Sequence, residues 1–139
     1  MKFFLISTFA CILSFSVTFA KGDLAIRAKK LELKLGSEKS DYDMSQKIFN
    51  LETGKAYNLE ITSMGFKEYE FEAEDFFRNI WIRKIEVEGV EINAPVLEGF
   101  EFEREGEIEI KFVPIRPGKY DFQIEGLESK GMVGKFVVE

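Results

Sequence analysis

The sequence predicts an all-β protein, a Greek-key sandwich or barrel of about seven or eight short strands. Three observations lead to this fold class. Apolar and polar residues alternate with a period of two along many short segments, which is the pattern of half-buried strands. These segments recur at regular spacing between turn residues, as they do in sandwiches with Greek-key connections. The chain shows no long helical period and no internal repeat.

The first twenty residues differ in composition from the rest. An apolar run follows Lys2, and the segment Thr18–Ala20 has the small-x-small pattern of a cleavage site. We therefore expect a secretory signal peptide over residues 1–20. A transmembrane anchor is the alternative, but the run is near the lower length limit for spanning a bilayer. Cys11 lies in a poor lipobox, which argues against lipidation.

The remaining residues, 21–139, have the length of one domain, and no Pro-, Gly- or Ser-rich linker divides them. They contain no cysteine, so they offer neither a disulfide nor thiolate chemistry. The formal charge of the chain is −6. Nucleic acid and anionic lipid headgroups repel such a protein. We expect a periplasmic or secreted monomer without a membrane span after cleavage, whose partner is a basic face of another envelope protein or a cation.

Apolar alternation predicts the strands of the first half in order. It covers 31–35, 48–51, 57–62 and 66–71, of which 57–62 is the clearest. Residues 63–65 break that third strand, and 73–77 read as a turn or a single helical turn.

The second half continues the same alternation. A strand is expected at 80–87, and a short one at 90–96 whose Pro95 places it at a sheet edge or end. Residues 100–103 and 107–112 flank Gly106 and form either a hairpin or two strands joined at a corner. Tyr120–Ile124 and Val133–Val138 close the chain, with a polar loop between them.

This C-terminal stretch resembles the end of a cupredoxin-like domain. It contains the pattern Pro-Gly-x-Tyr-x-Phe at 117–122, a loop, and then Gly-Met-x-Gly at 131–134 before the last strand. Residues 59–71 resemble the segment in which a His-x-Phe supplies the first copper ligand of that family. The resemblance covers roughly 57–139 and points to secreted, single-domain bacterial members, some of which accompany copper or iron handling. An immunoglobulin-like sandwich without its Cys pair is the rival architecture.

The resemblance also implies where copper ligands would lie, and this chain departs from the family there. A type 1 copper site uses two imidazoles, one thiolate and a weak axial group such as Met. Tyr69 stands at the first His position, Ile124 at the Cys position and Met132 at the axial position. The chain contains no His. The residue inventory therefore excludes blue-copper electron transfer.

Two methionines are the candidate metal ligands. Met132 and Met64 would form a soft-metal site, because thioethers suit Cu(I) and the two loops lie at the same end of a cupredoxin sandwich. Packing is the favoured alternative, since Met readily fills gaps in a core. Copper at this pair is the one cofactor that the sequence leaves open.

Three aromatic residues are the candidate partner contacts. Tyr69 would place its ring where copper would sit and its hydroxyl on a loop backbone group, or it is an ordinary core tyrosine. Phe76 and Phe77 are adjacent, and neighbouring residues on a strand cannot both point inward, so one of them would be exposed for docking. The alternative, which we favour, is a turn that lies over the core.

Glutamates alternate along 68–75 and 101–109. Carboxylates on one strand share a face but do not converge as Ca²⁺ requires, so we expect a solvated face paired with basic residues across strands.

No enzyme signature is present, because His and a nucleotide-binding glycine loop are absent and the serines have no neighbouring base motif. We therefore expect a binding or accessory module of the cell envelope that uses its ligand-loop end, with a link to metal handling. The alternative is a periplasmic metal carrier that uses Met and carboxylate ligands.

Overall fold

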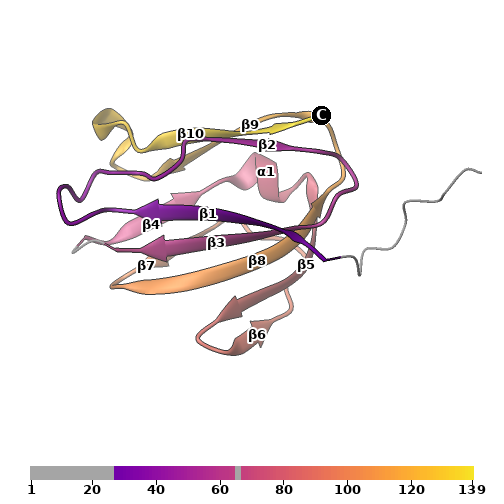
Figure 1. Ribbon diagram of the computed structural model, residues 1–139, viewed down its shortest axis with the longest axis horizontal. Helices are drawn as coiled ribbons and strands as arrows, with labels where there is room; N and C mark the ends of the chain where they lie inside the picture. The colour runs from indigo at the N-terminus through magenta and orange to yellow at the C-terminus, as the bar shows by residue number, and fades with distance from the viewer. Residues whose placement is uncertain (1–26, 65–66) are drawn as a thin grey trace, which may run out of the picture.

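The computed structural model describes residues 27–64 and 67–139, which form two five-stranded sheets packed face to face (Figure 1). Sheet A has the order β1 (Lys29–Leu35), β3 (Tyr57–Ser63), β8 (Gly106–Pro114), β5 (Ile80–Val87) and β6 (Val90–Ile92). Sheet B has the order β2 (Ile48–Leu51), β10 (Val133–Val138), β9 (Gly118–Ile124), β4 (Tyr69–Glu72) and β7 (Gly99–Phe102). The signal peptide predicted over 1–20 lies outside the described residues and stays a prediction.

The predicted all-β sandwich is confirmed, and the described residues form ten strands instead of seven or eight, of which β6 and β7 are short edge strands. The chain crosses repeatedly between the sheets, and β1 pairs with β3, and β2 with β10, in parallel. The segments around Gly106 are not a hairpin. β7 belongs to sheet B and β8 to sheet A, so the corner alternative is correct.

Strand alternation produces the core. In β3 every second side chain from Tyr57 to Ser63 is buried, and the residues between them are half-exposed. The inner face of sheet A is mainly aliphatic, with buried Leu33, Leu59, Ile61, Ile85 and Ile110. The inner face of sheet B is aromatic, with buried Phe49, Phe71, Phe122 and Phe136 in ring contact.

The predicted helical turn is present as α1 (Glu74–Phe77), which packs under sheet B. Its Phe76 ring stacks on Phe136 with 3.9 Å between the ring centroids. A 3-10 turn, η1 (Glu128–Lys130), ends at Gly131, whose φ of 83° is the left-handed conformation that glycine adopts at low cost.

The β5–β6 hairpin turns on two residues with positive φ. Glu88 has a φ of 50° and Gly89 a φ of 79°. Two consecutive positive φ values define the type I′ turn, which suits the twist of a two-residue hairpin. Glu88 is less suited to this conformation than Gly, which has no Cβ, or Asn, whose short polar side chain can hydrogen-bond locally.

Among the described residues, no helix is both long enough and apolar enough to cross a bilayer.

Candidate functional site

Three residues that the sequence placed at copper-ligand positions meet at one end of the sandwich, which we call the ligand pole (Tyr69, Ile124 and Met132). The Ile124 N–H donates to the Met132 carbonyl at 3.0 Å, and Ile124 lies opposite Phe71 in the β4–β9 pair. The Glu125 N–H donates to the Glu70 carbonyl at 2.9 Å, and Tyr69 is the residue before Glu70 on β4. All three side chains are fully buried.

Tyr69 closes this pole from inside. Its hydroxyl donates to the backbone carbonyl of Asp41 at 2.7 Å, which is a hydrogen bond to a loop backbone group. Burial, and next the charge of Asp41, raises the pKa of the Tyr69 phenol, so this group stays protonated and keeps donating. A ring that is 0% exposed offers no surface to another protein, so its assignment as a direct partner contact is wrong.

The donor set at the ligand pole does not fit a type 1 copper ion. The Tyr69 oxygen is bound to a backbone carbonyl, and Ile124 has no lone pair to offer. Met132 belongs to the hydrophobic core cluster and is 0% exposed. Because no imidazole or thiolate accompanies this buried thioether, we interpret Met132 as a residue that packs in the core.

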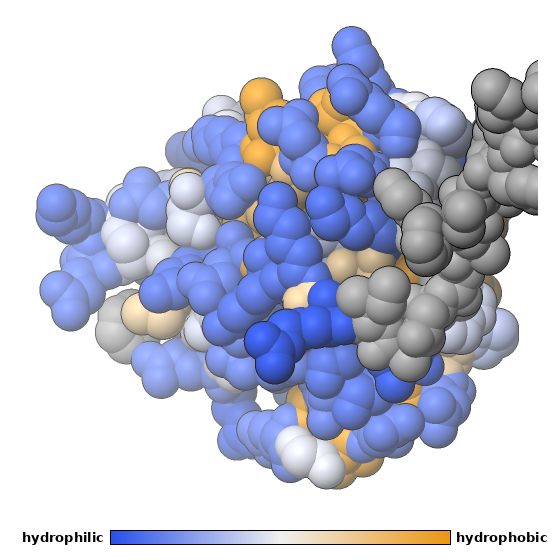
Figure 2. Space-filling view, turned by 45° about the vertical axis from the view of Figure 1, so that its right-hand side comes forward, coloured by the Kyte–Doolittle hydropathy of each residue, from blue (hydrophilic) through white to orange (hydrophobic). Residues whose placement is uncertain are grey.

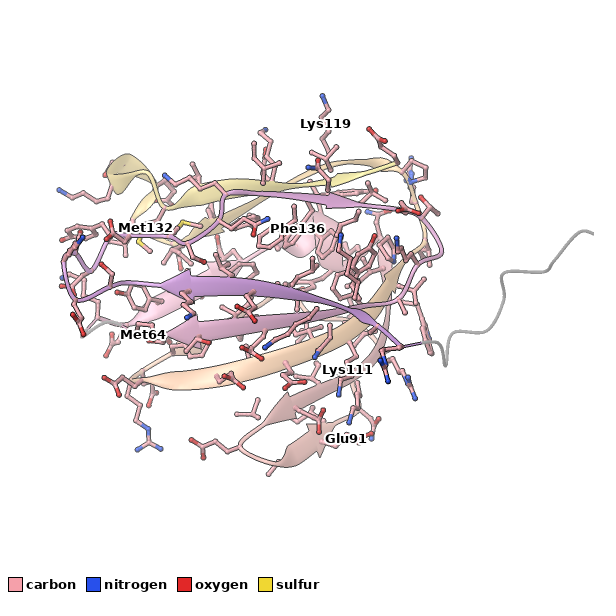
Figure 3. All side chains as sticks on the ribbon, in the orientation of Figure 1. Met64, Glu91, Lys111, Lys119, Met132 and Phe136 are labelled. Carbon is pink, nitrogen blue, oxygen red and sulfur yellow. The ribbon has the colours of Figure 1, made fainter. Side chains whose placement is uncertain are left out.

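Met64 lies at the same end of the sandwich but beside the other sheet. It follows β3 directly, and Figure 3 shows it across the sandwich from Met132. The Met64 side chain is 45% exposed, whereas Met132 is enclosed. Ser63 beside it has a buried hydroxyl without a hydrogen-bond partner among the described residues, but a hydroxyl does not suit Cu(I). Burial thus separates the two thioethers that the sequence grouped together.

Phe76 and Phe77 are both in the core, with exposed fractions of 0% and 1%. This burial matches the favoured alternative, a turn that lies over the core, and leaves neither ring exposed for docking. The reason is local, since α1 turns both rings inward where a strand would have turned one outward. Phe76 contacts Phe112, Tyr120 and Phe136, and so joins the two sheets.

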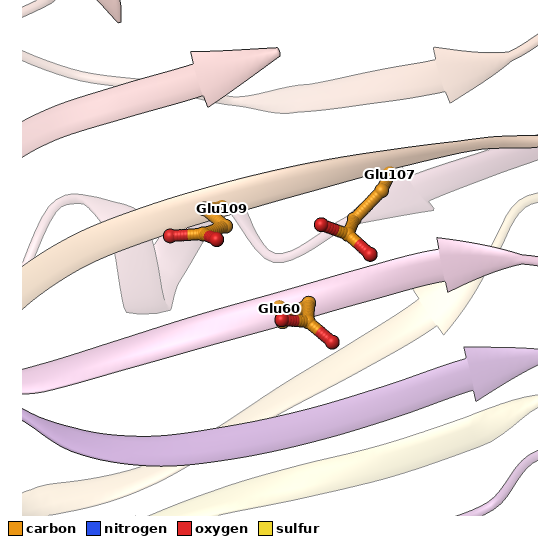
Figure 4. Close-up of side chains that lie close together, drawn as sticks. All are labelled: Glu60, Glu107 and Glu109. Atoms are coloured by element: carbon orange, nitrogen blue, oxygen red, sulfur yellow. The ribbon is translucent and has the colours of Figure 1, made fainter. Parts of the chain in front are cut away.

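The glutamates converge more than the sequence indicated. Carboxylate oxygens of Glu60, Glu107 and Glu109 lie within 4.8 Å of one another on the outer face of sheet A (Figure 4). A second group of the same compactness contains Glu70, Glu72 and Glu125 on sheet B. The expectation that strand carboxylates do not converge is wrong at these two places, because neighbouring strands bring them together in a register that the sequence does not show.

The two groups differ in their counter-charges. In the sheet A group, the Glu60 carboxylate accepts from the Lys30 ammonium at 2.9 Å, and Glu109 accepts from the Asn58 amide at 2.9 Å. In the sheet B group, the hydrogen bond that the protonated Glu70 carboxyl donates to Glu125, and next the charge of Glu125, raise the pKa of Glu70 above its ordinary value. Like charges therefore face each other on sheet B.

This sheet B group borders an open groove of about 590 Å³ between β4, β7, β9 and α1. Its acidic lining comprises Glu70, Glu72, Glu74, Asp75, Glu98, Glu101 and Asp121. Lys119 is the basic residue among the described residues that line it, and its side chain extends away from the sheet (Figure 3). We call this surface the acidic face.

No protein-family model and no curated protein sequence matches the chain. Solved structures do match its fold. The 2F4 variant of McoA multicopper oxidase from Aquifex aeolicus is 13% identical with a TM-score of 0.58, over 81% of this chain and 29% of that chain. A laccase from Pediococcus acidilactici is 12% identical with a TM-score of 0.58, over 100% of this chain and 31% of that chain. A multicopper oxidase from Campylobacter jejuni is 12% identical with a TM-score of 0.51, over 79% and 29%.

The chain spans less than half the length of these oxidases. At such low identity the likeness concerns the fold alone. It confirms the architecture expected from the C-terminal pattern, which is a cupredoxin-like fold. What distinguishes it is a ligand pole filled by a hydrogen-bonded tyrosine, an isoleucine and a buried methionine.

Proposed function

We propose that this protein is an exported, non-enzymatic binding or accessory module of the cell envelope that works without a type 1 copper ion. The observation that carries the proposal is the closed ligand pole. Tyr69, Ile124 and Met132 are as deeply buried as the rest of the core, so this end is stabilised by packing and by the bond to Asp41. A domain built in this way has no need of a metal to complete its fold.

Several features support a binding role. Short loops surround the ligand pole, and a shallow pocket of about 480 Å³ lies among them between Lys67, Glu68, Glu103 and Leu127. The acidic face adds a field that attracts a basic partner and raises its association rate. The cleavage pattern at Thr18–Ala20 supports export to the periplasm or beyond. The copper-oxidase neighbours support a link to metal handling, through a partner and not through an ion bound here.

A copper titration tests this proposal. Purified protein is titrated with Cu(I) in competition with a chelator, and with Cu(II) while the visible absorption is followed. We expect no binding that competes with the chelator and no copper–thiolate band. Submicromolar Cu(I) binding that disappears in a Met64→Leu, Met132→Leu double variant would contradict the proposal. Leu replaces Met with little change in volume, so the double variant is expected to fold.

The second candidate function is a metal carrier, and the convergence of Glu70, Glu72 and Glu125 within 4.8 Å favours it. Three carboxylates supply oxygen ligands for a hard cation. Isothermal titration with Ca²⁺, Mn²⁺ and Zn²⁺ tests this candidate. A carrier requires binding that is lost in Glu125→Gln and kept in the matched variant Glu107→Gln, which changes the sheet A group.

A further inference from the structure

On the side of the sandwich where both sheets end, β6 is the last strand of sheet A and β7 is the last strand of sheet B. An open groove of about 440 Å³ lies between them. Its apolar lining includes Ile85, Val87, Ile92, Leu97 and Phe100. We call it the edge groove. The fold leaves it uncovered because no further strand of the described chain continues either sheet.

The apolar side chains of β6 face the inner side of the sandwich. Ile92 lies opposite Ile85, and Val90 lies opposite Val87, so each pair shares a face. Ile85 is buried, yet Ile92 is 44% and Val90 61% exposed. Sheet B ends before it covers this last strand. Figure 2 shows hydrophobic atoms at the lower end of the molecule, at the height where β6 lies in Figure 1.

The rim of the edge groove is acidic. Its carboxylates are Glu88, Glu101, Glu103, Glu105 and Glu107, and Arg104 is the basic residue beside them. None of these five carboxylates forms a salt bridge with a described residue. An apolar floor beneath a row of unneutralised carboxylates is complementary to a segment that carries both apolar and basic side chains.

The free edges of β6 and β7 specify the conformation of that segment. Each edge strand presents backbone N–H and C=O groups that no described strand pairs with. An added strand satisfies such groups and directs alternate side chains to opposite sides. One side would meet the apolar floor, and the other would meet the rim carboxylates.

We propose that the edge groove binds an extended segment of a partner protein in which apolar residues alternate with Lys or Arg. The inference deepens the proposed function, and rests on it, by naming the class of partner that a binding module of this kind takes. The copper titration examines the ligand pole and a peptide titration examines the edge groove. Failure of one is therefore distinguishable from failure of the other.

The probe is a capped synthetic peptide of sequence KVKVKV, with EVEVEV as the charge-reversed control. Binding is followed by isothermal titration, and the site is mapped by the backbone amide shifts of the labelled protein. We expect KVKVKV to bind, EVEVEV not to bind, and the largest shifts to fall on β6 and β7. Added salt should weaken binding, because the rim carboxylates are exposed.

Two variants with the same added charge locate the site. Ile92→Lys places a cation on the floor of the edge groove, and Ile115→Lys places one on an exposed residue of the β8–β9 turn. Ile92→Lys should weaken binding about tenfold or more, which corresponds to the loss of one good apolar contact. Ile115→Lys should change it by less than about twofold, as for a distant surface charge. A Glu103→Lys, Glu105→Lys variant, which keeps the floor intact, should also bind less well.

Three results would overturn the proposal. KVKVKV does not bind at concentrations up to about 1 mM, the range of weak complexes. Ile92→Lys and Ile115→Lys weaken binding equally, which indicates general attraction to an acidic protein. The amide shifts fall on the acidic face around Glu70 and Glu125, which places the peptide on the other surface.

Discussion

On the outer face of sheet A, the ammonium groups of Lys84 and Lys111 each lie 2.8 Å from the Glu86 carboxylate. On the outer face of sheet B, Glu70 has Glu125 as its charged neighbour, and Glu101 lies opposite it on β7. Figure 3 shows Lys111 and Glu91 on the strands of sheet A and Lys119 on the opposite side of the sandwich. Both faces come from the same glutamate-rich alternation, yet Glu86 is paired with lysines whereas Glu70 faces another glutamate.

The inner faces of the two sheets differ as well. Sheet A contributes branched aliphatic side chains, and sheet B contributes phenylalanines that stack on α1 and on each other. The ligand pole and the acidic face both belong to sheet B. The outer face of sheet A is thus held by ion pairs, while the ligand pole and the acidic face lie on the side of sheet B. The following predictions test this division, beginning with the largest effect.

Truncation of an aromatic ring in sheet B should have the largest effect. Phe136 is fully buried and its ring centroid lies 3.9 Å from Phe76 and 4.9 Å from Phe122. Phe136→Ala should lower the free energy of unfolding by about 3–5 kcal/mol, because the ring leaves a cavity that rigid neighbours cannot fill. Urea denaturation measures this loss. Ile110→Val in sheet A removes only one methylene group and should cost about 0.5–1.5 kcal/mol, so a loss at Phe136 within that range would contradict the prediction.

The closed ligand pole provides the next test. Tyr69→Phe removes the hydroxyl that donates to Asp41 and leaves that carbonyl without its partner. The free energy of unfolding should fall by about 1–2 kcal/mol, as for a buried hydrogen bond. Tyr42→Phe is the control, since it retains the ring that Lys67 and Lys130 contact. If both variants are equally stable, the bond to Asp41 does not hold the pole closed.

The hairpin of sheet A is strained at one residue. Glu88→Asn should raise the free energy of unfolding by about 0.5–1 kcal/mol, because Asn adopts a positive φ more readily in a type I′ turn. Thermal unfolding measures the gain. The matched change Glu91→Asn, in extended β6, should give no gain, and a gain there would show that the lost charge matters and not the turn.

Removal of a glutamate charge should change the free energy of unfolding in opposite directions on the two sheets. The hydrogen bonds from Lys111 and Lys84 lower the pKa of Glu86 to about 2, so its ion pairs stabilise the fold above the ordinary pKa of 4.5 and are lost as the pH falls toward 2. Glu86→Gln should therefore destabilise the protein at pH 7. Its difference from the parent chain should shrink below pH 4.5.

The reverse holds for Glu70. Its raised pKa means that the folded protein binds the proton more tightly than the unfolded chain, so the ionised pair with Glu125 destabilises the fold at high pH and the penalty disappears as the pH falls through the raised value. Glu70→Gln should stabilise the protein at pH 7 and have no effect in acid. Urea titrations of both variants at several pH values measure this contrast, and effects of the same sign would remove the difference between the faces.

Strand positions were largely predictable from side-chain alternation. The expected strand at 57–62 is observed as Tyr57–Ser63, and the expected strand at 120–124 lies within Gly118–Ile124. Such segments are predictable because burial of one face requires a period of two along the chain itself. The pair around Gly106 was less certain, because local pattern cannot tell whether two adjacent strands share a sheet.

The sequence predicted which residues lie at the candidate site, but it did not predict what surrounds them. The position of Tyr69 followed from the resemblance of residues 59–71, those of Ile124 and Met132 followed from the C-terminal pattern, and the structure places them at one end of the sandwich. The burial of Phe76 and Phe77 depended on a one-turn helix, and the approach of Glu70 to Glu125 depended on strand register. The edge groove had no sequence signal, since Ile92 reads as an ordinary inward-facing strand residue.

The sequence by itself determined that this sandwich has an alternating core and no imidazole with which to bind type 1 copper, because both properties follow from which side chains the chain contains and how they are spaced. Only the tertiary structure decided which glutamates meet a lysine, which meet another glutamate, and which apolar edge stays uncovered. Those outcomes depend on how strands distant in the chain are ordered and aligned, and no spacing within one segment encodes that alignment.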